Sequence, residues 1–505
     1  MRRTRRLRAA RALRLRYGAA HLKEPRSAPG TWFLWAVALV LAAGTLAAAL
    51  HDVSTAWDVW WYHMPFAARL WGIVPNGSYL FRELTEARYQ GFPLLTEALQ
   101  GFLWRCLGRP EAANLVSFGG FVGYVLFLQR RYGVPWPLAF VALMAVPVVQ
   151  LHATACYVDL PSNLAGSALV LVAYDVLRRA GPIPDRERLL LAALAGCAVN
   201  MRFQLYPLVG AVLVVTAPRV FGPILGELRG GERRAAIGRI ALSCLALGLV
   251  FATPLKNWVL HANPLYPVHF PLAGASMPAV EEVFDATPPY LDRAPRVVLW
   301  LYSILEIGIR PLSDPRRWTI DQWMPPSSTG NMMGGYFGAY VVFQLAVLGW
   351  IGMRDRSRDV RLALALFGGL TAVAALSPQP QVLRYYMYWM IVLVSLNLTL
   401  AHREGIAVAR APRTALGVGA VAALAVVLAV TRCTYVYPSG SSFAGLLQEK
   451  VSAEIIADIR ERERICLTRE PWSFLYVSAF HPTSPRYVVQ EAEDPDGCGA
   501  ARWIP

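Results

Sequence analysis

Charged residues are scarce in this chain. Only 16% of the 505 residues are Asp, Glu, Lys or Arg, whereas 55% are hydrophobic, and the mean hydropathy is +0.38. Soluble domains carry about 25% charged residues, so an ordinary soluble fold of this length is excluded. Apolar runs near the ~20 residues needed to cross a bilayer recur along the chain, with no long heptad or Gly-X-Y period. This composition predicts a polytopic membrane protein.

Familiar catalytic patterns are also missing. The sequence contains no HExxH, GxSxG, P-loop or CxxC pattern, which removes several hydrolase, nucleotide-binding and redox classes. The predicted spans hold almost no ionisable side chain near mid-bilayer, and Asp175 lies near the end of its span. Ion-coupled transporters normally need such groups along their path, so transport is disfavoured.

Eleven apolar segments are predicted to be membrane spans. They are 31–50, 112–129, 136–151, 160–177, 189–201, 204–217, 236–254, 335–353, 361–377, 383–401 and 414–431. One more apolar stretch, 91–107, carries Glu97, Gln100 and Arg105 and is short for a crossing. We expect it to form an amphipathic helix that lies at the membrane surface.

The distribution of basic residues predicts which loops face the cytoplasm, because cytoplasmic loops collect Lys and Arg. With eleven spans and a cytoplasmic N-terminus, the short loops hold 18 basic residues inside and 2 outside. Counting 91–107 as a span would invert every later loop and place Arg130 and Arg131 outside. The excess of 49 Lys and Arg over 33 Asp and Glu is therefore a signal of topology. It indicates contact with anionic membrane lipids, and no nucleic-acid partner is expected.

This topology predicts an all-α polytopic membrane protein in three parts. They are a basic cytoplasmic arm (1–30), a transmembrane domain (31–431) with outer loops 51–111 and 255–334, and a small extracytoplasmic C-terminal domain (432–505), expected to be α/β. A bacterial inner or plasma membrane is the expected location. Cys466 and Cys498 share the outer tail, where either a disulfide or a pair of buried reduced thiols would fit.

Short polar motifs recur at the outer ends of the predicted spans. Asp58 and His63 lie in the aromatic segment WDVWWYHMP, just after the first span. The other motifs are QGFPLLTE at 90–97, HATACYVD at 152–159, Lys256-Asn257, NPLYP at 263–267 and LRYY at 383–386. Every one of them falls on the outer face in a topology that rests on charge alone, which a scatter of unrelated polar residues would not be expected to do.

In order and sidedness these motifs resemble those of the GT-C superfamily of polytopic glycosyltransferases, which includes protein O-mannosyltransferases and the lipid A aminoarabinose transferase. The resemblance covers roughly 30–400. Its matching features are Asp58 in a D-x3-YH-x-P-like stretch, juxtamembrane helices at about 60–72 and 92–107, Asp159 after the third span, the stretch at 263–267, and Arg384 with Tyr385.

The resemblance implies transfer of a hexosyl, pentosyl or aminosugar group from a polyprenyl-phosphate donor to a lipid, glycan or protein acceptor on the outer side. The acceptor must lose a proton as it attacks, so a carboxylate is needed as general base, a role worth ~10²–10⁴-fold. Asp58 is the candidate base, and Asp159 is the second catalytic candidate. Arg384 and Lys256 would stabilise the phosphate. The other expected substrate-binding residues are His63, Glu97, Asn263, Tyr266 and Tyr385.

Each candidate also has a structural alternative. Asp159 suits a helix cap, Glu97 suits the solvated face of an amphipathic helix, and Asn263 is typical of a turn. His63 suits an aromatic membrane interface equally well. Together with Asp58, the residues Asp159, Glu97 and His63 are sufficient ligands for a divalent metal ion, but their spacing matches no metal pattern and no cofactor is certain.

Two functions from other classes stay open at this stage. One is a flippase or transporter for a lipid-linked substrate, which would need a polar path across the bilayer. The other is a non-catalytic scaffold of the cell envelope that keeps the same fold.

Overall fold

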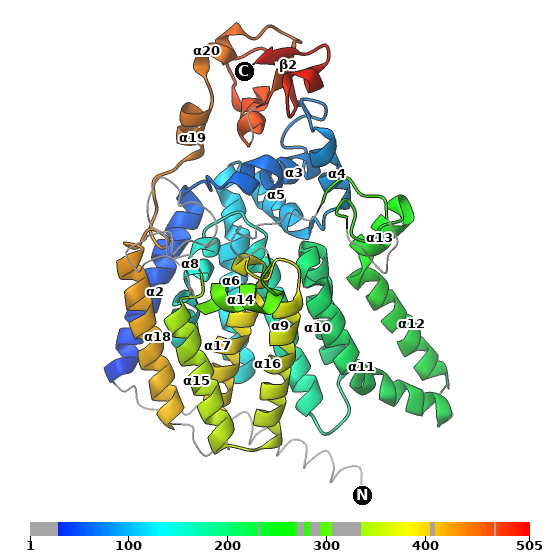
Figure 1. Ribbon diagram of the computed structural model, residues 1–505, viewed down its shortest axis with the longest axis vertical. Coiled ribbons are helices and arrows are strands. Elements are labelled where there is room, and N and C mark those ends of the chain that lie inside the picture. The colour runs from blue at the N-terminus through cyan, green and yellow to red at the C-terminus, as the bar shows by residue number, and fades with distance from the viewer. Residues whose placement is uncertain are drawn as a thin grey trace, which may run out of the picture.

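The computed structural model describes residues 29–230, 233–269, 277–282, 293–305, 335–403, 410–468 and 471–504. A bundle of long helices forms the lower part of Figure 1, a layer of shorter helices covers one end of the bundle, and a small strand-containing unit stands above that layer. We call the covered end the capped end. Residues 1–28 of the predicted arm (1–30) and most of 270–334 in the predicted outer loop (255–334) fall outside the described residues.

Each of the eleven predicted spans coincides with a helix or with a bent pair of helices. The single helices are α2 (Pro29–His51), α6 (Leu115–Tyr132), α9 (Asp159–Arg178), α10 (Asp185–Met201), α11 (Tyr206–Arg229), α15 (Gly338–Arg354), α16 (Arg358–Leu376), α17 (Met387–His402) and α18 (Arg410–Val430). The pairs are α7 (Trp136–Met144) with α8 (Pro147–Ala153), bent by 103°, and α12 (Arg233–Val250) with α13 (Ala252–His261), bent by 70°. A further apolar helix, α14 (Arg296–Leu305), lies across the bundle in Figure 1.

The helices themselves indicate fewer membrane crossings than the sequence predicts. Among the described residues, six helices are long and apolar enough to span a membrane alone, and eight spans result if each bent pair counts as one. Helices α10, α15 and α17 have only 16 or 17 residues. An integral membrane protein with several apolar helices is supported, and the exact count of eleven stays a prediction.

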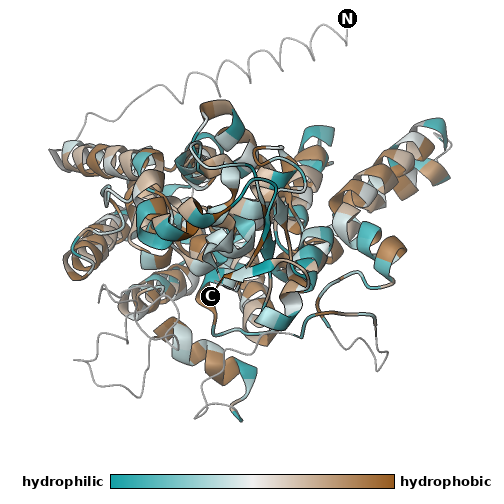
Figure 2. Ribbon diagram, turned by 90° about the horizontal axis from the view of Figure 1, so that it is seen from above, coloured by the Kyte–Doolittle hydropathy of each residue, from teal (hydrophilic) through white to brown (hydrophobic). Residues whose placement is uncertain are grey.

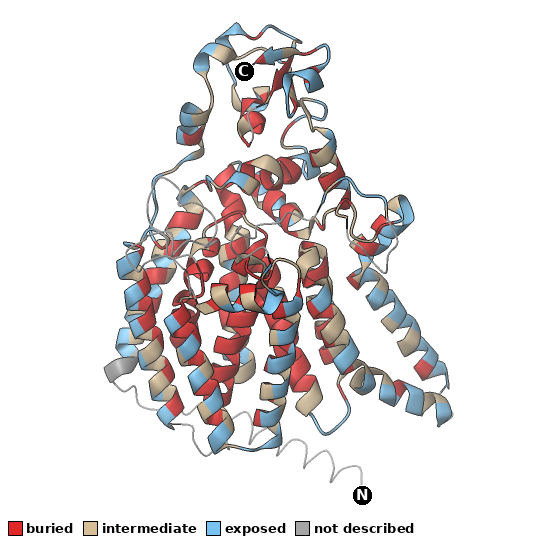
Figure 3. Cartoon of the chain, in the orientation of Figure 1, coloured by how far each residue is buried: buried red, intermediate tan, exposed pale blue. Residues whose placement is uncertain are grey.

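The bundle is organised around a buried pair of helices, α9 and α17, which pack against each other. Every residue of α17 from Met387 to Ala401 is buried, as expected of a helix that is hydrophobic all round. The peripheral helices instead expose large apolar side chains such as Leu39, Val214 and Val418. Figure 2 shows these hydrophobic outer faces from above, and Figure 3 shows buried residues gathered at the centre. Exposed apolar faces of this kind suit contact with lipid.

Short helices make up the layer at the capped end. They are the five-residue π-helix η1 (Val59–His63), α3 (Met64–Leu70), α4 (Glu83–Gly91) and α5 (Leu95–Leu107). The predicted surface helix at 91–107 is α5, which lies over the bundle in Figure 1 and packs on α3. Gly101 makes this packing feasible, because a Cβ there would lie 2.5 Å from the carbonyl oxygen of Ala67.

The C-terminal residues build a parallel four-stranded sheet together with a strand from the segment between α3 and α4. The strand order is β1 (Tyr79–Leu80), β3 (Val488–Glu491), β2 (Arg464–Leu467) and β4 (Arg502–Ile504). The helices of this unit are α19 (Phe443–Lys450), α20 (Ala453–Asp458), η7 (Trp472–Tyr476), η8 (Ser478–Phe480) and η9 (Pro495–Cys498). Cys466 and Cys498 form a disulfide that joins β2 to η9. Strands in the tail agree with the expected α/β character, and the domain boundary at 432 stays a prediction.

Candidate active site

Four segments that are distant in the sequence converge at the capped end of the bundle. They are the start of η1, the loop between α8 and α9, the end of α10, and the short helix η6 (Leu383–Tyr386) that leads into α17. Each brings a charged or aromatic side chain to the same place.

The first contact is an ion pair between Asp58 and Arg384. Nη1 of Arg384 lies 3.2 Å from Oδ2 of Asp58, and the two side chains are 16% and 22% exposed. The guanidinium also lies 5.4 Å from the ring centroid of Tyr157 and 5.3 Å from that of Tyr385. Because ion pairing and cation–π contacts act on the same group, they hold Arg384 in a defined orientation.

A second ion pair joins Asp159 to Arg202, and these side chains are only 1% and 11% exposed. The guanidinium of Arg202 lies 4.4 Å from the ring centroid of Tyr385. Tyr385 therefore contacts both arginines. We call the two pairs and this ring the charge cluster (Asp58, Asp159, Arg202, Arg384 and Tyr385), whose four charges sum to zero.

A buried amide links the two halves of the charge cluster. Nδ2 of Asn163, one turn after Asp159 on α9, donates to the carbonyl oxygen of Asp159 at 2.7 Å and to that of Arg384 at 3.3 Å. Its Oδ1 accepts from the backbone N–H of Tyr388 at 2.9 Å. Asn163 thus fixes the backbone of η6 on the first turn of α9.

Helix α5 supports the cluster from above. Nε2 of Gln100 donates to the carbonyl oxygen of Cys156 at 2.6 Å, which holds the loop that carries Tyr157. One turn earlier, Glu97 pairs with Nδ1 of His63 at 2.8 Å, and both side chains are buried. These two predicted substrate-binding residues therefore connect η1 to α5, and no solvated face is present at Glu97.

Two tyrosine hydroxyls near Asp58 keep their protons. Burial raises the pKa of Tyr62 well above its usual value, and the charge of Asp58 raises it further. Burial likewise raises the pKa of Tyr157, with a smaller contribution from Asp58. Both phenols are therefore hydrogen-bond donors at neutral pH. Arg88 of α4 lies 4.1 Å from the ring centroid of Trp61 and 5.3 Å from that of Tyr62.

The predicted residues near α13 make a different set of contacts. Nζ of Lys256 donates to the carbonyl oxygen of Gln90. Nδ2 of Asn263 donates to the carbonyl oxygens of Val268 at 3.1 Å and Pro278 at 2.9 Å, as a turn-forming asparagine does. Tyr266 stacks on His261 with 3.8 Å between ring centroids. Substrate binding by Lys256, Asn263 and Tyr266 stays a prediction.

The four residues considered for a divalent ion do not gather as ligands. Asp58 and Asp159 each pair with an arginine, while His63 pairs with Glu97. Within the described ranges, no group of three or more His, Cys, Asp or Glu residues is arranged to hold a metal ion. The donor set therefore does not fit a metal centre.

Arg202 and Asn163 were not among the residues predicted from the sequence. A signal for Arg202 was present, because Arg202 and Arg384 are the two basic residues counted in the short loops predicted to lie outside. A signal for Asn163 is its position four residues after Asp159, which places both on one face of a helix.

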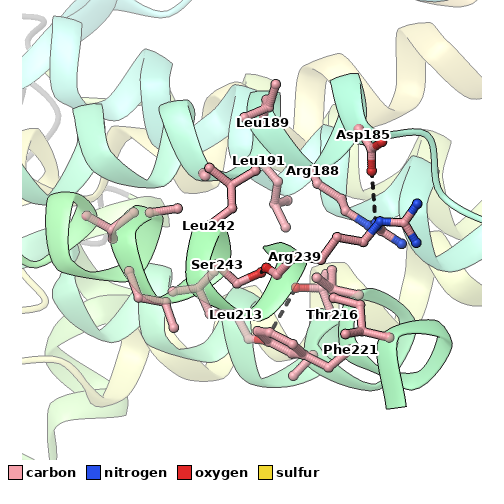
Figure 4. A pocket seen from close by; sticks show the side chains of 17 residues that line it. Asp185, Arg188, Leu189, Leu191, Leu213, Thr216, Phe221, Arg239, Leu242 and Ser243 are labelled. Atoms are coloured by element: carbon pink, nitrogen blue, oxygen red, sulfur yellow. Dashed lines mark hydrogen bonds and ion pairs between the residues drawn. The ribbon is translucent and has the colours of Figure 1, made fainter. Parts of the chain in front are cut away.

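A separate apolar pocket of about 240 Å³ lies between α10, α11 and α12 (Figure 4). Leu191, Leu213 and Leu242 are typical of its wall, and an ion pair between Arg188 and Asp185, 2.9 Å long, stands at one end. Asp185 begins α10, whereas Arg202 follows the last residue of that helix, so the polar end of the pocket is remote from the charge cluster. Its walls suit hydrocarbon and offer a sugar few hydrogen bonds.

Comparison with protein-family models and with curated protein sequences gave no match. Among solved structures, the crystal structure of ArnT from Cupriavidus metallidurans in the apo state is similar, with a TM-score of 0.51 and 14% sequence identity. The alignment covers 94% of this chain and 88% of that chain. This chain has an ArnT-like fold. The likeness agrees with the polytopic helical fold expected from the motifs, and at 14% identity it shows the fold alone.

Proposed function

We propose that this chain is a membrane glycosyltransferase that moves a sugar from a polyprenyl-phosphate-linked donor to an acceptor hydroxyl or amine. The Asp58–Arg384 pair carries the proposal, because it places a carboxylate and a cation 3.2 Å apart at the capped end. Inverting transfer from a lipid phosphate needs both a base for the acceptor and a cation for the leaving group. The ArnT-like fold supports the same class of reaction, and the charge-based topology predicts that the capped end lies on the extracytoplasmic face.

Asp58 is better placed than Asp159 to be the general base. The Asp58 side chain is 22% exposed and stands immediately before η1, the first helix of the layer, whereas the Asp159 side chain is 1% exposed. An acceptor that enters from the capped end can reach Asp58 without displacing the bundle. We assign Asp159 the role of holding Arg202 in position.

The two arginines suit the phosphate of the donor. Arg384 and Arg202 both lie close to Tyr385, at 5.3 and 4.4 Å from its ring centroid. Guanidinium groups bind phosphate oxygens bidentately and stabilise the charge that grows as the sugar–phosphate bond breaks.

The ion pair suggests an order of events. Without donor, an oxygen of Asp58 is occupied by Arg384. A donor phosphate competes for the N–H groups of Arg384 and so releases the carboxylate for the acceptor. Asp58 then takes the acceptor proton while the acceptor oxygen or nitrogen bonds to the anomeric carbon. The bond from that carbon to the phosphate oxygen breaks, and polyprenyl phosphate leaves with its negative charge held by the arginines.

The direct test is transfer by the purified protein reconstituted in lipid nanodiscs. Each of a set of radiolabelled polyprenyl-phosphate sugars would be offered together with extracted envelope lipids, glycans and proteins as acceptors. Labelled product from at least one donor is expected. A correctly folded protein that is inactive with every donor would contradict the proposal and favour the non-catalytic scaffold.

A further inference from the structure

A second cavity lies outside the charge cluster, between the first outer loop and the C-terminal residues. It measures about 510 Å³, and its lining comes from α3, the turn at 74–77, β1, α4 and η7. We call it the aromatic cleft. Its principal side chains are Arg69, Tyr79, Phe81, Glu86, Tyr89 and Phe474.

Four aromatic rings in the cleft hold one another in place. Tyr79 meets Phe474 edge-on with 5.1 Å between centroids, and it meets Phe81 in the same way at 5.3 Å. Phe81 and Tyr89 lie 6.2 Å apart. Phe474 belongs to the tail and the other three to the first outer loop, so the cleft exists only because these two parts pack together. Rings fixed in this way give a preformed binding surface.

An ion pair between Arg69 and Glu86 lies among these aromatic rings. Nη1 and Nη2 of Arg69 donate to the two carboxylate oxygens of Glu86 at 2.5 and 3.2 Å, and the side chains are 40% and 33% exposed. The guanidinium also lies 4.1 Å from the ring centroid of Tyr89. The pair has no net charge, and its planar groups remain open to a ligand on the solvent side.

The carboxylate of Glu86 stays charged at neutral pH. Burial alone would raise the pKa of Glu86, but hydrogen bonds from Arg69 and Gln90 outweigh it and the pKa is lowered. The carboxylate is therefore an acceptor. The exposed Asn76 at the rim of the cleft adds an amide that both donates and accepts.

We propose that the aromatic cleft binds a neutral saccharide that forms part of the acceptor. A sugar ring presents an apolar C–H face, which packs on aromatic rings, and adjacent hydroxyls, which pair with fixed planar groups such as a carboxylate, a guanidinium or an amide. A phosphate would find no net positive charge here, because Glu86 neutralises Arg69. This proposal rests on the proposed glycosyltransferase function, because it names a glycan as the acceptor of that reaction.

The position of the cleft fits this role. Phe66 of α3 lies between the two sites, with its ring 5.3 Å from Tyr89 and 5.9 Å from Tyr62. Helix α4 also connects them, because Glu86 and Tyr89 face the cleft while Arg88 contacts Trp61 and Tyr62 beside Asp58. The cleft therefore adjoins the side chains that surround Asp58, as binding of part of the acceptor requires.

Binding can be measured directly with the full-length protein in nanodiscs, without any transfer reaction. The probes are mannotriose, cellotriose and chitotriose, observed by saturation-transfer NMR and titrated to saturation. We expect saturable binding of at least one trisaccharide. Arg69→Gln combined with Asn76→Ala should weaken it about tenfold or more, since hydrogen bonds to charged groups are lost.

Two control variants make the result specific. Asp458→Asn removes a carboxylate that pairs with Arg502 in the C-terminal unit, where the Arg502 side chain is 38% exposed against 40% for Arg69, and it should leave binding unchanged. Asp58→Asn should bind trisaccharide as wild type does even if it transfers nothing, which separates this proposal from the catalytic one. Absence of saturable binding by all three probes, or binding that the cleft variant does not weaken, would overturn the proposal. Preferential binding of phosphate or of an aromatic peptide at the cleft would overturn it as well.

Discussion

Removing the side chain of Arg202 should destabilise the protein strongly, although Arg202 lies at the end of a helix. The partner carboxylate of Asp159 is 1% exposed, so water cannot replace the lost cation. Breaking a buried ion pair by removing one partner costs about 3–5 kcal/mol, because the remaining charge is left in a medium of low polarity. We therefore expect Arg202→Gln to lower the free energy of unfolding by an amount in that range.

A double-mutant cycle separates the pair from other contacts of Arg202. In Asp159→Asn/Arg202→Gln two neutral amides replace two charges, so no buried charge is left unpaired. This double variant should be more stable than Arg202→Gln alone by about 2 kcal/mol or more. The assay is denaturant-induced unfolding of the purified protein in micelles, followed by tryptophan fluorescence.

The more exposed pair provides the comparison. Asp58→Asn should change the free energy of unfolding by about 1 kcal/mol or less, since its side chain is 22% exposed. If Arg202→Gln unfolds at the wild-type denaturant concentration, or if the double variant recovers nothing, the buried pair does not exist as described. The role of Asp159 in positioning Arg202 would then be wrong.

Three further predictions concern other parts of the chain. Replacing Cys466 and Cys498 with serine should lower the melting temperature of the strand-containing C-terminal unit, because a disulfide across a sequence separation of 32 residues contributes about 3 kcal/mol. A melting temperature that is the same with and without reductant would contradict this prediction. Asn163→Ala should raise the KM for the donor and lower the free energy of unfolding by about 1–3 kcal/mol, because the backbone of Arg384 loses its hydrogen bond to α9. An unchanged KM would show that this hydrogen bond does not position Arg384. A cytoplasm-dependent reporter fused to the C-terminus should be silent if the charge-based topology holds, and strong activity there would reverse it.

Sequence patterns were most informative where one physical effect dominates. Long apolar runs predicted the helices of the bundle because the bilayer demands them. The polar content of Glu97 and Gln100 predicted that α5 does not cross the membrane, and both side chains are buried against neighbouring parts of the layer. Asp58, Asp159, Arg384 and the other motif residues were placed at the outer ends of spans by charge bias alone.

Pairing could not be predicted in the same way. The contact of Arg384 with Asp58 depends on how η6 packs beside η1. The contact of Arg202 with Asp159 depends on how the end of α10 packs beside α9. No local sequence pattern encodes either arrangement. Strand β1 has two residues and therefore no alternation to detect, yet it pairs with β3 of the tail through Tyr79 and Val489. The contacts of side chains near α13 could not be predicted either. Asn263 lies at the expected end of the bundle, but its hydrogen bonds are within its own turn and to Pro278.

The central claim is that Asp58 is the general base, and the turnover of Asp58→Asn tests it most directly. Asparagine keeps the size of the side chain but cannot take the proton of the acceptor. Transfer from a polyprenyl-phosphate sugar should fall by ~10²–10⁴-fold, roughly 3–5 kcal/mol of transition-state stabilisation, with folding intact. Asp185→Asn, at the far end of α10, is the matched control and should transfer normally. Near-normal turnover by Asp58→Asn would contradict the account and move the base to another carboxylate, with Asp159 the next candidate.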